Sequence, residues 1–209
     1  MIIMYPQEFI GILIPFVLLM LLFLKIFTTI PKTKGKTHNQ KIQILKDEFG
    51  FKKINLLCLF YSVLFSLALI VGLYLIFGYQ KTNNVQIEFI TVIMVLYSLF
   101  LAPIWEELAF RRILFDDIIL NHVYKSFNID WKDWKNIKSV FWFSFALSVQ
   151  ALLFVLAHEL TTVGFSYFGR FLMALIAGLV YIKYDRNIYY PIAAHFAYNL
   201  SIVLVNFIL

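Results

Sequence analysis

The sequence of 209 residues is 62% hydrophobic and 14% charged, and its mean hydropathy is +0.82. Soluble domains average about 45–50% apolar and about 25% charged residues, and a soluble fold of this length could not bury so much apolar surface. The net charge of +6 comes from lysines and arginines gathered in alternate connections between apolar runs, a pattern typical of membrane proteins that excludes a DNA-binding face. We therefore predict an integral membrane protein that contacts lipid and binds no nucleic acid.

The predicted elements are helices that span a bilayer, whose apolar core needs about 20 residues of helix. The first apolar run is interpreted as a retained span rather than a signal peptide, because residues 1–8 contain no Lys or Arg. Pro103 separates the third span from an amphipathic segment, so we expect a further amphipathic or re-entrant helix over residues 104–120, which Pro103 either starts or joins to the span as a kink in a longer helix. The sequence predicts an all-α polytopic bundle of about six spans, at residues 9–30, 54–79, 89–103, 140–160, 167–184 and 188–209.

Basic residues orient the predicted bundle. The Lys-rich stretch 31–53 and the stretch 121–139 are expected in the cytoplasm together with Lys183 and Arg186, which places the N-terminus outside. No linker or repeat marks a second domain, so residues 1–209 are predicted to form one membrane domain. The composition, rich in Lys, Ile, Phe and Asn, is typical of low-GC bacteria and indicates a bacterial plasma membrane.

Two carboxylates and an arginine follow the third predicted span. Glu107 and Arg111 are four residues apart, so on a helix they face the same way and can form an ion pair. Glu106 then lies about 100° around the helix and points elsewhere. Charged side chains within a bilayer are rare unless they function or pair, which makes Glu106 a candidate for chemistry. The structural alternative is that all three residues mark the cytoplasmic end of a helix.

Two further pairs at helical spacing lie in later spans. Phe154 precedes His158 by one turn, and His195 precedes Asn199 by one turn among alanines that allow close packing of helices. Each pair has a structural alternative, because a histidine near the end of a span is often interfacial and a His/Asn pair can join two helices by hydrogen bonds. The zinc-protease motif H-E-x-x-H is absent, since Thr162 stands where its second histidine is required.

Taken together and in this order, the motifs resemble those of the CAAX-protease and bacteriocin-processing family, also called CPBP or Abi. The resemblance covers about residues 89–200, so we expect residues 89–209 to form the catalytic core and residues 1–88 to add two spans without family motifs. The family motifs Glu-Glu-x-x-x-Arg, Phe-x-x-x-His and His-x-x-x-Asn are supplied by Glu106, Glu107, Arg111, Phe154, His158, His195 and Asn199.

The resemblance implies an intramembrane endopeptidase of the glutamate type, whose substrate is a membrane-associated peptide or a lipidated protein. CAAX-type proteins and bacteriocin or pheromone precursors are both suitable substrates. Glu106 is the expected base that activates water, and His158 is expected to hold that water or relay a proton. His195 and Asn199 are the expected donors to the oxyanion. Supporting roles fall to Phe154 and to the pair of Glu107 and Arg111.

Several alternatives stay open at this point. No cofactor is expected, but zinc is an alternative, with Glu106, His158 and His195 as its ligands. A non-catalytic bacteriocin self-immunity or regulatory protein is the second functional hypothesis, and a transporter with a proton relay is a third. Catalysis is favoured because a pure binding protein needs neither a base nor oxyanion donors.

One difficulty concerns depth in the membrane. Hydropathy places Glu106 and His195 in the cytoplasmic half of the bilayer but His158 toward the outer end of its span, whereas catalysis requires all three to meet. A deeper start of the 140–160 helix, a re-entrant 104–120 segment or a strong tilt would bring them together.

Overall fold

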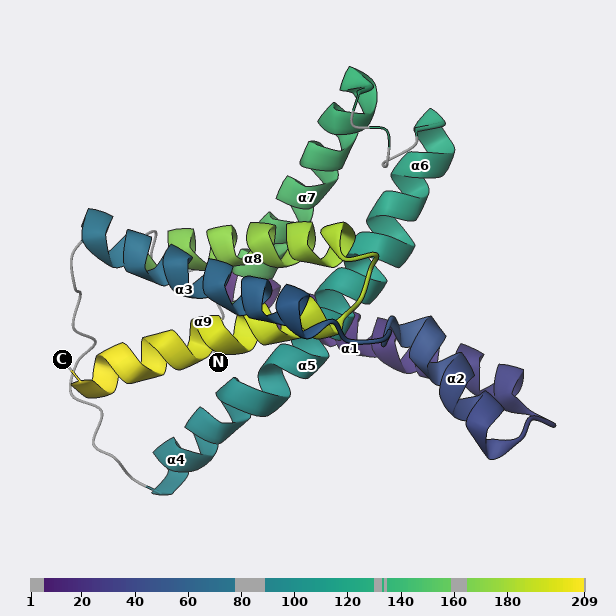
Figure 1. Cartoon of the computed structure of the whole chain (residues 1–209), viewed down its shortest axis with the longest axis horizontal. Helices are drawn as coiled ribbons and strands as arrows, with labels where there is room; N and C mark the ends of the chain where they lie inside the picture. Colours follow the sequence, from purple (N-terminus) through teal and green to yellow (C-terminus); the bar gives the residue numbers. More distant parts are fainter. Residues whose placement is uncertain (1–5, 78–88, 130–132, 134, 159–164, 209) are drawn as a thin grey trace.

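The computed structural model describes residues 6–77, 89–129, 133, 135–158 and 165–208, and every regular element among them is helical (Figure 1). The predicted all-α class is therefore confirmed. In chain order the elements are α1 (Pro6–Thr29), the 3-10 helix η1 (Ile30–Thr33), α2 (His38–Phe49), α3 (Leu56–Phe77), α4 (Phe89–Leu96), the π-helix η2 (Tyr97–Leu101), α5 (Ala102–Glu107), the π-helix η3 (Leu108–Leu120), α6 (Asn121–Phe127), α7 (Ile137–His158), α8 (Phe165–Lys183) and α9 (Tyr189–Ile208).

The helices follow the predicted spans closely. Among the described residues, three stretches are long and apolar enough to cross a membrane, namely Leu13–Thr33, Leu56–Leu73 and Ile137–His158. The exact number of spans stays a prediction. Helix α2 is polar by contrast, and its ends are set locally by a capping box between Thr37 and Gln40 and by Gly50 in the left-handed conformation.

Of the two expectations for Pro103, the structure has the longer helix. Elements α4 to α6 form a single unbroken helical rod from Phe89 to Phe127, which Figure 1 shows running past α5. Pro103 lies in the first turn of α5, directly after the π-helical turn η2, where the Ala102 N–H donates to the carbonyl of Tyr97 five residues earlier. A wider turn accommodates a proline ring that would clash within a regular α-helix. Residues 104–120 are therefore part of this rod.

The α6–α7 hairpin explains how His158 reaches Glu106. The rings of Phe127 and Trp142 stack with centroids 3.9 Å apart, so the first turns of α7 lie beside the end of α6. In Figure 1 these two segments project together beyond the bundle of α1, α3, α8 and α9. Because α7 begins at Ile137 on this projection, its last residue, His158, meets Glu106 at the end of α5.

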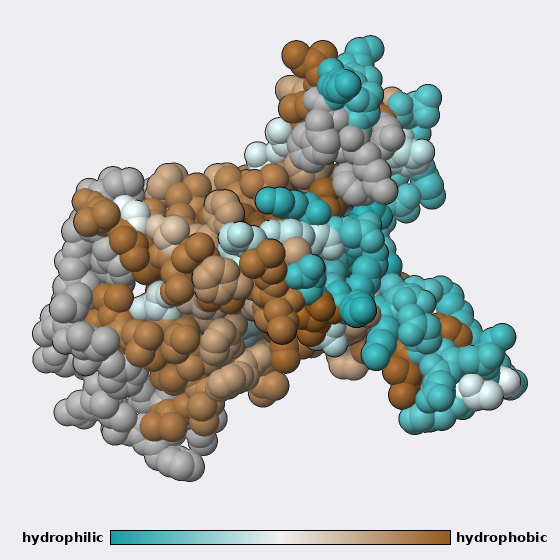
Figure 2. Space-filling view, in the orientation of Figure 1, coloured by the Kyte–Doolittle hydropathy of each residue, from teal (hydrophilic) through white to brown (hydrophobic). Residues whose placement is uncertain are grey.

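The two N-terminal spans, which carry no family motif, belong to the same core as the motifs. Leu18 of α1 and Ile70 of α3 are 2% and 3% exposed, and they pack in one cluster with Phe110 and Phe154. Large apolar side chains on the outer faces of α1, α3 and α7 remain exposed, as expected of surfaces that face lipid. Figure 2 shows this hydrophobic surface bordered by hydrophilic surface over α2 and α6.

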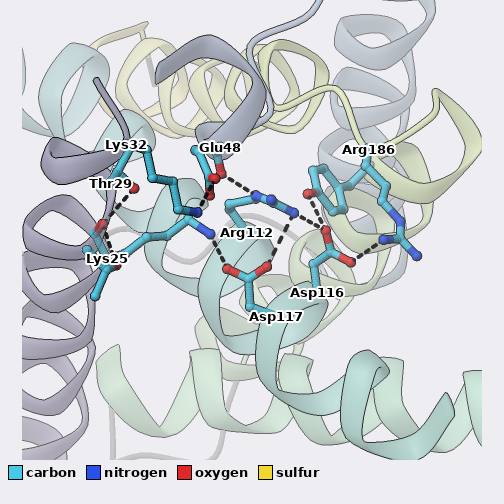
Figure 3. A network of polar contacts seen from close by, with 10 residues as sticks. Lys25, Thr29, Lys32, Glu48, Arg112, Asp116, Asp117 and Arg186 are labelled. Carbon is cyan, nitrogen blue, oxygen red and sulfur yellow. Dashed lines mark hydrogen bonds and ion pairs between the residues drawn. The ribbon is translucent and has the colours of Figure 1, made fainter. Parts of the chain in front are cut away.

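Charged residues from separate connections join in one network at the hydrophilic end (Figure 3). The best-buried member is Asp116, 3% exposed, which accepts from Tyr181 at 3.1 Å and pairs with Arg186 at 2.8 Å. The hydrogen bond from Lys32 lowers the pKa of the Glu48 carboxyl. The network therefore ties α1, α2 and the α8–α9 turn to η3; its ion pairs are Lys25–Asp117, Lys32–Glu48, Arg112–Asp116, Arg112–Asp117 and Arg186–Asp116.

Candidate active site

The three motifs come from three helices that meet at one place. Glu106 and Glu107 are the last residues of α5, His158 is the last residue of α7, and His195 lies in the first half of α9. Helix α9 packs on α5, and α7 packs on η3 directly after α5. Residues 52 and 88 positions apart in the chain thereby come into contact.

Glu106 faces both histidines. Its Oε2 atom lies 3.1 Å from Nε2 of His158 and 3.7 Å from Nε2 of His195, and the residue is 6% exposed. A carboxylate and two imidazoles at this spacing can exchange protons with one water molecule placed among them.

The orientation of His158 is set by its own helix. Its Nδ1 atom lies 2.7 Å from the carbonyl oxygen of Phe154, which can only accept, so Nδ1 carries the proton. In the neutral ring the Nε2 atom therefore carries no proton and can only accept. Because the Glu106 carboxylate is also an acceptor, a hydrogen bond between the two groups requires one further proton. This pair is consequently built to share a proton.

Glu107 is held in a separate, fully buried group. The Arg111 guanidinium contacts it twice, with Nη2 donating to Oε1 at 3.3 Å and Nε lying 2.9 Å from Oε2, and both side chains are 0% exposed. The second approach is an ion contact, because the Nε–H is not directed at the oxygen. His195 donates its Nδ1–H to Oε1 of Glu107 at 2.9 Å. Glu107 therefore orients His195, and the i,i+4 pair with Arg111 forms as its spacing predicts.

Phe154 packs among all of these groups. Its ring stacks on His158 with centroids 4.4 Å apart and meets His195 edge-on at 5.7 Å. The Arg111 guanidinium lies over the same ring, 5.2 Å from its centroid. The aromatic residue thus fixes the spacing of the two histidines and covers the arginine, which explains why a phenylalanine stands one turn before His158.

Asn199 points to the main chain of the rod rather than to a carboxylate. Its Nδ2 atom donates to the carbonyl oxygen of Ser98 at 2.8 Å. This bond uses one of the two hydrogens of the amide.

The motif residues line a cavity of about 330 Å³. A larger cavity of about 650 Å³, lined mostly by apolar side chains of α3, α7 and α8, contains no motif residue and lies apart from this chemistry. The walls of the smaller cavity are formed by Tyr97, Ser98, Ala102, Glu106, Phe154, His158, Arg170, Met173, His195, Tyr198, Asn199, Ile202 and Val203.

A family model described as type II CAAX prenyl endopeptidase Rce1-like matches residues 88–201, more than half of the chain, and this stretch contains all three motifs. The chain belongs to this family. The resemblance found over residues 89–200 is thereby confirmed, and with its long apolar helices this Rce1-like chain is an integral membrane protein. No curated protein and no solved structure shows a significant match to it.

Two polar residues at the Rce1-like site escaped the sequence analysis. Gln150 is fully buried one turn before Phe154, and with its amide oxygen turned toward Arg111 it accepts from Nη1 at 2.7 Å. Arg170 of α8 lines the cavity. The available signal was the same in both cases, since each is a polar or charged residue inside a predicted span.

Zinc was the alternative cofactor, and its donor types are present at this site. Both histidines direct Nε2 toward the same oxygen of Glu106, and zinc accepts histidine and carboxylate ligands. Within the described part of the chain, however, no group of three His, Cys, Asp or Glu side chains is placed to hold a metal ion. The zinc alternative stays a prediction, and the reaction proposed for this site uses the side chains alone.

Proposed function

We propose that this Rce1-like chain is an intramembrane endopeptidase of the glutamate type that hydrolyses a peptide bond in a prenylated or otherwise membrane-associated peptide or protein. The observation that carries the proposal is the convergence of Glu106 with the Nε2 atoms of both histidines in a cavity walled by apolar helices. The family description supports a lipidated substrate.

The first step is the attack of water on the scissile carbonyl. Glu106 takes a proton from a water molecule that lies between it and the histidines, while the water oxygen forms a bond to the carbonyl carbon. The negative charge passes to the carbonyl oxygen. His195, whose Nδ1–H is held by Glu107, donates to that oxygen through an Nε2–H when its ring is protonated.

The second step breaks the carbon–nitrogen bond. The leaving nitrogen needs a proton, which comes from Glu106 directly or through His158, whose Nε2 atom lies 3.1 Å from the glutamate. The products are a carboxylic acid and an amine, one water molecule is consumed, and Glu106 returns to its starting state. Glu107 and Arg111 do not exchange protons in this scheme and serve as the buried support of His195.

The substitution Glu106→Gln tests the proposal, because glutamine keeps the shape of the side chain and removes the base. The purified protein is reconstituted in liposomes with a quenched fluorescent, farnesylated peptide that ends in a CAAX sequence. We expect kcat/KM to fall by about 10²-fold or more, with unchanged membrane abundance and unfolding midpoint. The matched control is Asp185→Asn, because the Asp185 side chain is 78% exposed in the α8–α9 turn. The activity of this variant should equal that of the wild type.

Full activity in the Glu106→Gln protein contradicts the proposed base. A wild-type protein that cleaves neither the farnesylated peptide nor the same peptide without its lipid contradicts the endopeptidase function and favours a non-catalytic immunity role. The metal question is settled by a chelator titration of the same liposomes. Undiminished cleavage after metal removal is the expected result, and loss that is restored by zinc supports the metal mechanism.

A further inference from the structure

The main chain before Glu106 has a carbonyl group, that of Ser98, whose usual α-helical and π-helical donors are both unable to serve it. In an α-helix the Ser98 carbonyl accepts from residue 102, and in a π-helix it accepts from residue 103. The Ala102 N–H is directed to Tyr97, and residue 103 is a proline, which has no N–H. Neither the α nor the π register therefore gives the Ser98 oxygen its donor.

Asn199 supplies the missing donor from a different helix. Its Nδ2 atom lies 2.8 Å from the Ser98 oxygen, and both residues line the cavity that contains Glu106. A carbonyl without a partner is costly within a membrane, and prolines are tolerated in membrane helices where a neighbouring helix satisfies the freed groups. The asparagine and the proline thus form a matched pair across α9 and the rod.

This contact lies where it can set the direction of Glu106. A π-helical turn contains one extra residue. In a helix of 3.6 residues per turn, that residue rotates the side chains after the turn by about 100° relative to those before it. Helix α9 holds the rod on both sides of α5, through Asn199 at Ser98 and through His195 at Glu107. The rotational setting of the two glutamates depends on both anchors.

We propose that Asn199 is a positioning residue, which holds the π-helical turn at Ser98 open so that Glu106 faces His158 and His195. The proposal rests on the endopeptidase function described above, and it differs from the oxyanion role that the family motif implies for this asparagine. The two roles separate cleanly, since a positioning residue becomes dispensable once the Ser98 oxygen receives another donor.

The substitution Pro103→Ala provides that donor, because alanine restores an N–H that reaches Ser98 in the existing π register. The experiment compares the wild type, Asn199→Ala, Pro103→Ala and the double variant. Cleavage of the farnesylated CAAX peptide in liposomes is followed as kcat and KM. We expect Asn199→Ala to lose about 10²-fold in kcat, as for a misplaced catalytic group, with KM little changed. The double variant should recover to within about tenfold of Pro103→Ala.

Unfolding midpoints of the same four proteins give a readout that does not depend on hydrolysis. The decrease in unfolding midpoint caused by Asn199→Ala should be smaller when Pro103→Ala is present. If Asn199→Ala accumulates poorly in the membrane, better accumulation of the double variant is the equivalent result. The matched control is Ser201→Ala on α9, whose buried hydroxyl donates only to Ala197 of its own helix at 2.7 Å. It should show no coupling to Pro103→Ala.

Two results overturn the proposal. If the changes in unfolding midpoint caused by Asn199→Ala and Pro103→Ala simply add in the double variant, the contact between Asn199 and Ser98 does not hold the turn. If those changes do not add but kcat fails to recover in the double variant, Asn199 acts on the reaction itself, as an oxyanion donor does. Failure of the endopeptidase function is recognised separately, by absence of cleavage in the wild type, and leaves the midpoint comparison valid.

Discussion

The buried pair of Glu107 and Arg111 supports a quantitative prediction about stability. Both side chains are 0% exposed, and their closest ion contact is 2.9 Å. The pair is also linked outward, because His195 donates to Glu107 and the amide of Gln150 faces Arg111. We consider three variants: Glu107→Gln, Arg111→Met and the two substitutions combined.

Each single substitution leaves one charge buried without its partner, which costs about 3–5 kcal/mol. In the double variant no unpaired charge remains, and the Gln oxygen at position 107 can still accept from His195. The remaining losses are the hydrogen bond to Gln150 and the contact of Arg111 with the Phe154 ring, together about 1–3 kcal/mol. The double variant is therefore expected to be more stable than either single variant.

Thermal unfolding in detergent, followed by the fluorescence of the four tryptophans, measures this difference. For a chain of this size 1 kcal/mol shifts Tm by roughly 2–4 °C, so each single variant should unfold roughly 6–20 °C below the wild type. Single variants that unfold close to the wild type would show that the pair is hydrated and unimportant. A double variant whose loss equals the sum of the two would refute the argument from charge pairing.

The remaining predictions use the same unfolding assay. Leu18→Ala in α1 should lower the free energy of unfolding by about 2–5 kcal/mol, because the Leu18 side chain is 2% exposed in the core. Leu19→Ala, at a residue that is 42% exposed, should lower it far less, and equal losses contradict the packing of α1. Gly178→Ala places a Cβ atom 2.4 Å from a side chain of α7 and should cost about 1–3 kcal/mol, while Gly72→Ala meets no atom within 4 Å and is the control. The lowered pKa of Glu48 stabilises the fold above its unfolded-state pKa, and this contribution disappears as the pH falls through the folded-state value. The Tm difference between Glu48→Gln and the wild type should therefore vanish on acidification, and a constant difference would contradict the ionic origin.

Helix boundaries and motif residues were accessible from the sequence because they are local properties. The predicted spans over 54–79 and 140–160 correspond to α3 and α7, since a long apolar run favours a membrane helix wherever its neighbours lie. The pairing of Glu107 with Arg111 was likewise predictable, because residues four apart on one helix share a face.

The features that the sequence concealed depend on distant partners. Pro103 is a strong local signal for a break, but the π-helical turn and the donor from Asn199 allow the rod to continue. The meeting of His158 with Glu106 was not evident from hydropathy, because it depends on the pairing of α6 with the start of α7. The burial of Asp116 against Arg186 of the α8–α9 turn was equally invisible in the linear pattern.

The sequence by itself determined the class of protein, the family and the residue types available for chemistry, because hydropathy and motif spacing are local properties of the chain. Only the tertiary structure decided how the two adjacent glutamates share the histidines, with Glu106 facing the Nε2 atoms of both and Glu107 accepting from Nδ1 of His195. Glu106 meets His158 and His195 at the cavity, and Glu107 is buried against Arg111. That division is set by the rotation of one helical rod against α7 and α9, and the rotation depends on contacts between residues more than fifty positions apart.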